Sequence, residues 1–222
     1  MPEENILRHE EWPAYRIGNR DYIHALGVIS AVFNNLEFRL RSLFPMYVRR
    51  PLPVAYALFA NSNNKRRLGL MREGINYSRH PDTIKDDVRY FLDCYKKCTD
   101  NRNVLMHSTV FFIFGPGDIS CPQLAPPGHQ PEGVGFQKFA KDDPFRINTY
   151  QLNIAELRKH ADDLKALEVY GDRLYWHILK HYEPTWYQAW GFPEEAQHAL
   201  PNRPAPPNLL VPIPPDPMPQ NK

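Results

Sequence analysis

Residues 100–109, DNRNVLMHST, combine side chains that bind phosphate with one that transfers protons. Arg102 carries a planar guanidinium that can hold a phosphate through two hydrogen bonds, and the Asn103 amide could orient the phosphate or the imidazole. His107 supplies an imidazole, which titrates near neutral pH. A base that can take a proton beside a fixed cation that can hold a phosphate would suit chemistry on a phosphate group. We therefore take Arg102, Asn103 and His107 as candidate catalytic residues.

The same stretch also has a purely structural interpretation. A histidine near the C-terminal end of a helix is favoured by the helix dipole. His107 could serve only that purpose, and the residues around it would then be the polar end of an ordinary helix. The sequence leaves both interpretations open.

Other catalytic and metal-binding motifs are missing from the sequence. His177 and His181 stand four residues apart, as metal ligands on a helix do, but there is no HExxH motif and no evident third ligand. No glycine-rich phosphate loop follows a predicted strand, and no serine or cysteine nucleophile motif is present. We expect neither a metal nor a cofactor, and the kinase, NTPase and hydrolase classes lack support.

Apolar residues spaced three and four apart predict four helices that would position these side chains. The first covers about residues 21–44, and the second about 54–77 with an interruption at NSNN. The third starts near Asp82 and leads into the DNRNVLMHST stretch. The fourth opens at Asn153 with Glu156 three residues later, which is a capping-box pattern.

Two β-rich runs separate the third helix from the fourth. TVFFIF (109–114) is β-branched and aromatic, and VGFQKFA (134–140) alternates apolar with polar residues. The connection between them is long and contains proline, and we interpret the two runs as a β-hairpin. The predicted fold is therefore mainly α: a four- to five-helix bundle with a β-hairpin inserted before the last long helix.

Two charged residues interrupt the apolar stripes of the first and third helices. The stripe that starts at Ile23 passes through Glu37, and the stripe that starts at Ile84 passes through Arg102. A charge at a buried position is costly unless it is paired. We expect Glu37 and Arg102 to share one cleft, with Glu37 holding Arg102 in its rotamer. The alternative is that both helices bend or end here and both side chains reach water.

Positive charge is concentrated in one part of the chain. Residues 39–79 contain nine basic residues and one acid, so this segment carries +8 and leaves −6 for the rest of a chain whose net charge is +2. Such asymmetry is typical of a protein that meets a polyanion, although a solvated helix face would look the same. As candidate RNA-binding residues we take Arg39, Arg49, Arg50, Lys65, Arg66 and Arg67.

The 222 residues suffice for one domain with an appendage, which we divide into an N-terminal extension (1–18), a helical domain (19–183) and a tail (184–222). No apolar run approaches the roughly 18 residues of a membrane span, and the first residues lack the apolar segment of a signal peptide. Cys94 and Cys98, one helical turn apart among three cysteines, suit reduced thiols. We expect a cytoplasmic protein without membrane contact.

The tail is rich in proline. It holds 11 of the 23 prolines, which exclude a helix or a central strand and favour a polyproline-type conformation. Its apolar residues, Leu209, Leu210, Val211 and Ile213, suggest that it lies along its own domain or a partner. Upstream of them, Trp186, Tyr187 and Trp190 are a candidate anchor for the tail.

The segment RNVLMH (102–107) resembles the R-polar-x-x-x-H signature of the HEPN superfamily (higher eukaryotes and prokaryotes nucleotide-binding). HEPN domains are bundles of four or five helices with the motif near the end of a late helix, and the predicted helices here have the same layout. The resemblance covers about residues 19–183. The stretch LEFRL, with its acid in the first helix, also has a counterpart in that fold. Thr109 stands where one toxin subgroup of the superfamily has tyrosine.

The resemblance implies an activity and a set of partners. Catalytic HEPN proteins are metal-independent endoribonucleases that work as dimers and bring two motifs together. The chain would then cleave RNA with Arg102 and His107 at a homodimer cleft, as a toxin or phage-defence effector whose partner is an antitoxin or another protein. The alternative is a non-catalytic HEPN-like module that binds RNA, a nucleotide or a protein partner.

Overall fold

A computed structural model describes residues 20–115, 118–120, 133–140, 146–183 and 202–214. The expected N-terminal extension and the candidate anchor at Trp186, Tyr187 and Trp190 lie outside these residues. The described part of the chain is mainly helical, as predicted. Its elements are α1 (Arg20–Val48), α2 (Leu52–Ala60), α3 (Asn64–Asn76), α4 (Asp82–Met106), β1 (Thr109–Gly115), β2 (Asp118–Ser120), β3 (Gly133–Phe139), β4 (Ile147–Leu152) and α5 (Ile154–Tyr182).

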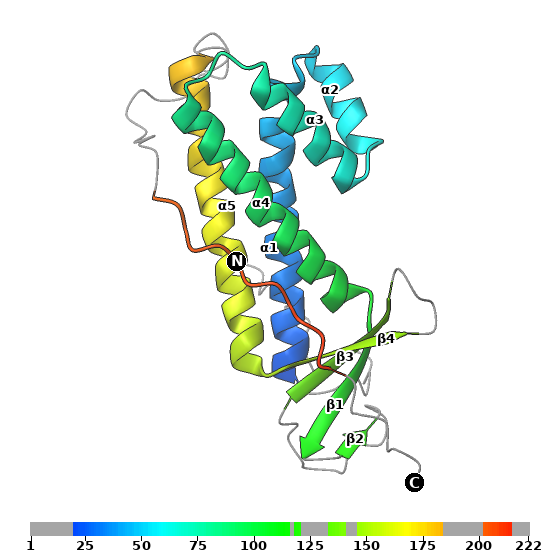
Figure 1. Ribbon diagram of the computed structural model, residues 1–222. Helices are drawn as coiled ribbons and strands as arrows, with labels where there is room; N and C mark the ends of the chain where they lie inside the picture. The colour runs from blue at the N-terminus through cyan, green and yellow to red at the C-terminus, as the bar shows by residue number, and fades with distance from the viewer. Residues whose placement is uncertain (1–19, 116–117, 121–132, 141–145, 184–201, 215–222) are drawn as a thin grey trace, which may run out of the picture.

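Three long helices form the body of the molecule. α1 and α5 run side by side in the same direction, and α4 runs in the opposite direction across them (Figure 1). Large side chains fill the space between them, among them Leu36, Leu40, Phe44, Phe91, Tyr95 and Tyr170. α5 approaches α4 closely at Gly171, where an added Cβ would lie 2.4 Å from the Phe91 ring. The core is therefore the seam between α1, α4 and α5.

The buried stripe of α1 differs from the predicted one. Ile23 is 47% exposed, whereas its neighbour Tyr22 is 4% exposed. Ala25 and Ile29 continue the buried face. The predicted and observed stripes converge at Phe33, so the helix was predicted correctly while its first turns are rotated by about one residue.

The predicted second helix is two helices, α2 and α3, and the NSNN sequence is the break between them. The Asn63 side chain accepts a hydrogen bond from the Arg66 backbone N–H at 2.9 Å, and this contact caps the start of α3. The Asn61 amide donates to the Ala57 carbonyl at 2.9 Å at the end of α2. Asparagine side chains compete with helical backbone hydrogen bonds, which explains why the chain turns here.

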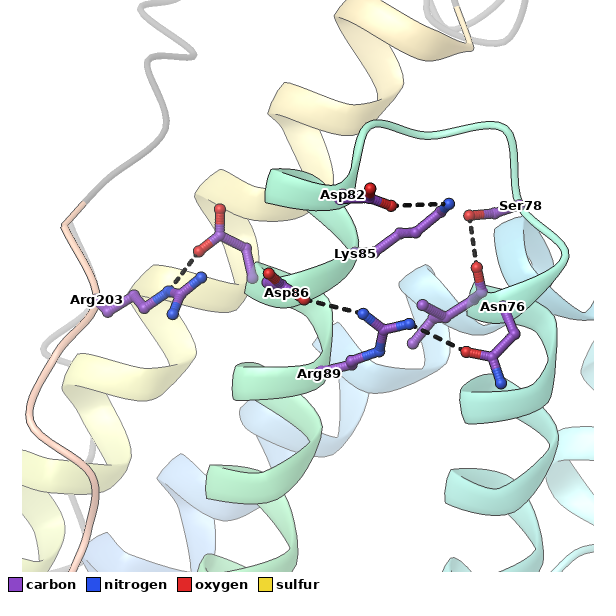
Figure 2. A network of polar contacts seen from close by, with 9 residues as sticks. Asn76, Ser78, Asp82, Lys85, Asp86, Arg89 and Arg203 are labelled. Carbon is purple, nitrogen blue, oxygen red and sulfur yellow. Dashed lines mark hydrogen bonds and ion pairs between the residues drawn. The ribbon is translucent and has the colours of Figure 1, made fainter.

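The turn from α3 into α4 is held by side chains of both helices (Figure 2). Arg89 donates to the Asn76 side chain at 3.0 Å and to the Asp86 carboxylate at 2.9 Å.

The start of α5 is fixed by the predicted capping box. The Asn153 N–H donates to the Glu156 carboxylate at 2.7 Å, and the Glu156 N–H donates to the Asn153 side chain at 2.9 Å.

A small antiparallel sheet follows the C-terminal end of α4 (Figure 1). The predicted hairpin is confirmed, because β1 pairs with β3 in a register that places Phe111 opposite Gly135. Two further strands extend it to the order β2-β1-β3-β4. β2 has only three residues and β4 is polar, INTYQL, so neither stood out as a strand in the sequence.

Residues 202–214 of the tail run along α4 and α5 towards β4 (Figure 1). The sequence left open whether this segment lies on its own domain or on a partner, and the structure places it on its own domain. The expected apolar attachment is wrong for Leu209, Val211 and Ile213, which are 50%, 77% and 44% exposed. The segment is held instead by polar contacts.

Within the described residues we find no helix with the length and apolar character that a membrane crossing requires.

Candidate functional site

Arg102 and His107 meet at the point where α4 ends. The Arg102 Nη1 atom lies 3.1 Å from His107 Nε2. Five residues of continuous helix would turn the two side chains roughly 140° apart. They meet because α4 ends at Met106 and the chain turns at His107 before entering β1. The predicted pair is therefore brought together by the end of the helix.

The two side chains of the pair differ in exposure and in hydrogen bonding. Because a guanidinium can only donate, His107 Nε2 is the acceptor in this contact. The His107 side chain is exposed, whereas Arg102 is half-buried and its guanidinium lies 5.5 Å from the centre of the Phe33 ring. The Arg102 Nε atom is buried, and the described residues provide no hydrogen-bond partner for it. The pair thus places an exposed imidazole beside a half-buried guanidinium.

Lys138 reaches the same region from β3. Its ammonium group donates to the Asn103 carbonyl at 2.8 Å, one of the last carbonyls of α4 that no further helical turn can satisfy. The Asn103 side chain, by contrast, makes no hydrogen bond to any described residue. The sheet therefore fixes the backbone of the motif and adds a positive charge, which the sequence alone did not assign to this site.

The expected pairing of Glu37 with Arg102 is not formed. Glu37 Oε1 accepts from Arg67 Nη1 of α3 at 2.6 Å. Phe33, one turn earlier on α1, lies against the Arg102 guanidinium instead. Leu36 occupies the buried position here, so Glu37 lies at the edge of the buried face and turns towards α3. The prediction that Glu37 holds Arg102 in its rotamer is wrong.

We expect Glu37→Ala to lower the free energy of unfolding by about 1 kcal/mol, as for a partly exposed ion pair. The Glu37 side chain is 36% exposed, and Arg67 keeps its hydrogen bonds to the Phe59 carbonyl and the Asn64 side chain. Urea unfolding measures the change, with Glu73→Ala as an exposed control on α3. A loss above about 3 kcal/mol would contradict this, because that is the loss expected for a fully buried pair.

The candidate RNA-binding residues divide into two groups. Arg39 is paired with Asp172 at 3.0 Å and with Glu168 at 3.5 Å, and Arg67 is paired with Glu37, so these two charges are neutralised. The other four are exposed and pair with no acid in the part of the chain that the structure describes: Arg49, Arg50, Lys65 and Arg66. The sequence could not separate the groups, since the acids are distant in the chain.

A cleft of about 380 Å³ opens between α1, α2 and α3. The Arg41 guanidinium lies 4.8 Å from the centre of the Tyr56 ring at its wall, and the Glu37–Arg67 pair lines it as well. Arg41 is exposed and has no acidic partner among the described residues. Stacked aromatic and guanidinium groups are surfaces on which bases of single-stranded RNA pack. Sequence reasoning did not single out either Arg41 or Tyr56.

The remaining candidates add no second site. Among the described residues no group of three or more potential ligands could hold a metal. Cys94 and Cys98 are free thiols, as predicted, and burial raises the pKa of Cys98 to about 12, so it is a poor nucleophile.

Comparisons of the chain with protein-family models, curated proteins and solved structures gave no match.

Proposed function

We propose that the protein is a HEPN-like, metal-independent endoribonuclease with Arg102 and His107 as its catalytic pair. The observation that carries the proposal is the 3.1 Å contact between the two side chains at an exposed helix end. An imidazole beside a guanidinium supports the proposal, because metal-free RNA cleavage needs a base and a fixed cation.

The arrangement suggests how the reaction would begin. A phosphate is a stronger acceptor for a guanidinium than a neutral imidazole, so a bound RNA would draw the Arg102 hydrogen bond away from His107 Nε2. Nε2 would then take the 2′-hydroxyl proton while the 2′-oxygen attacks phosphorus. The bond to the 5′-oxygen breaks, leaving a 2′,3′-cyclic phosphate and a 5′-hydroxyl. The Asn103 amide, which has no partner among the described residues, is placed to contact the phosphate.

The leaving 5′-oxygen needs a proton at the moment when His107 is accepting one. A single imidazole cannot be both base and acid in the same step. His107 of a second copy is a suitable donor, which makes a homodimer with paired motifs part of the proposal. Incubation of the purified protein with single-stranded RNA in EDTA tests the activity, and cyclic phosphate ends on the products identify the mechanism. Intact RNA in that experiment would remove the proposed catalysis.

A non-catalytic RNA-binding module is the second candidate. The four cations that pair with no acid among the described residues favour it, as does the Arg41–Tyr56 cleft, because these groups can hold RNA without His107. A bound nucleic acid with no cleavage in EDTA, by wild type and by His107→Ala alike, would select this alternative.

Removing two of these cations should weaken the salt dependence of RNA binding. Each neutralised charge contributes about 0.7 to the slope of log K against log salt for a single strand, so Lys65→Gln with Arg66→Gln should flatten it by about 1.4. Fluorescence anisotropy with a labelled oligonucleotide measures the slope. The matched control removes two exposed cations of α5, Arg158→Gln with Arg173→Gln, and should leave it unchanged. Equal slopes for both double variants would contradict an RNA contact at α3.

A further inference from the structure

The docked part of the tail, residues 203–213, lies in a groove whose polar groups it satisfies. At its first residue, Arg203 Nε donates to Asp87 of α4 at 2.6 Å, and Figure 2 shows Arg203 pointing from the tail towards α4. Asp87 is 6% exposed and also accepts from the Tyr170 hydroxyl of α5 at 2.9 Å. Burial, followed by the hydrogen bond to Asp87, raises the pKa of Tyr170, which keeps its hydroxyl a donor. The groove thus provides a buried acceptor for one arginine.

Asn101 binds the tail backbone at two points. Its amide nitrogen donates to the Asn208 carbonyl at 2.7 Å, and its amide oxygen accepts from the Leu210 N–H at 2.9 Å. Asn101 is 1% exposed, and no other residue in the described part of the chain bonds its side chain. Without the tail this donor and this acceptor in the wall of the bundle would lose their partners in the protein. Asn101 is therefore arranged to recognise an extended backbone.

Two further contacts complete the groove. The Tyr90 hydroxyl donates to the Pro204 carbonyl, and the Thr149 carbonyl of β4 accepts from the Ile213 N–H at 2.7 Å. Pro207 is buried, whereas alternate side chains further along the tail face solvent. The ligand is thus selected by an extended main chain, a leading arginine and a buried proline. A proline-rich segment is already extended, so it loses little conformational freedom on binding.

We propose that this α4–α5 groove is a peptide-recognition site for an extended, arginine-led, proline-containing segment, and that the tail of a second copy of the chain can replace the chain's own. All the polar contacts described are made by residues 203–213. The same segment presented by another copy would make the same contacts. The site is separate from the proposed ribonuclease function and does not depend on it.

A full-length chain with a weakened tail tests the proposal. Arg203→Ala removes the cation, and Leu210→Pro removes the N–H that Asn101 accepts. Both residues lie in the tail and outside the core between α1, α4 and α5, so the bundle should remain folded. A fluorescent peptide with the wild-type sequence 202–214 should bind this double variant at least about tenfold more tightly than it binds the wild-type chain, whose groove is occupied.

Further variants show whether the peptide occupies the groove. Adding Asn101→Ala to the double variant should weaken peptide binding about tenfold, and adding Asp87→Asn should weaken it as well. Leu209→Pro is the matched tail control, because the structure shows no hydrogen bond from the Leu209 N–H to any described residue, and it should not open the groove. Equal binding to wild type and double variant, or binding that ignores Asn101 and Asp87, would overturn the proposal.

Discussion

Replacing His107 with alanine is expected to lower RNA cleavage in EDTA by about 10²–10⁴-fold, the usual contribution of a positioned acid–base group. The free energy of unfolding should hardly change, because His107 is exposed and the Arg102 contact is the one hydrogen bond found for it among the described residues. A surface substitution of this kind usually changes stability by no more than about 0.5 kcal/mol. Single-turnover cleavage of a labelled oligonucleotide, together with thermal unfolding, measures both effects.

The matched control for this variant is His181→Ala, which removes an exposed histidine from the last turn of α5. It should leave cleavage and stability unchanged. Cleavage that survives in His107→Ala would show that another group is the base. A large fall in stability without any cleavage by the wild type would favour a structural role for His107 at the end of α4.

Gly74→Ala is expected to destabilise the protein by about 2–3 kcal/mol, as overpacking does where the obstacle is backbone. An added Cβ at Gly74 would lie 2.0 Å from the Tyr47 carbonyl oxygen and 2.7 Å from its carbon. Neither atom can move without shifting α1 or α3. For a chain of this size the melting temperature should fall by about 4–12 °C.

The same helix offers the control. Gly69 of α3 has no atom within 4 Å of its added Cβ, so Gly69→Ala meets open space. Alanine there should raise stability by about 0.5–1 kcal/mol, because glycine is a poorer helix former. Calorimetry on the two variants compares steric crowding directly with helix propensity. A neutral Gly74→Ala would show that α3 does not pack against α1 as closely as the structure has it.

Local features of the sequence predicted most of the fold. The capping box at Asn153 and Glu156 satisfies backbone groups within four residues, so it can be identified without tertiary information. The β-branched and aromatic run from Thr109 pairs with the alternating run from Val134 as expected. The short strand β2 and the polar strand β4 were missed because pairing to a neighbouring strand, and not local propensity, places them in the sheet.

The sequence alone identified Arg102, Asn103 and His107 as candidate catalytic residues, because their types and their spacing can be read from it directly. The tertiary structure decided which of these groups touch. Arg102 meets His107 because the helix ends between them. Glu37 meets Arg67 because Leu36 takes the buried position and leaves Glu37 at the edge of the buried face. Asn101 could not be identified as a binding residue from the sequence. It recognises backbone N–H and C=O groups, and because almost every residue carries these groups, no sequence pattern indicates where they will be bound.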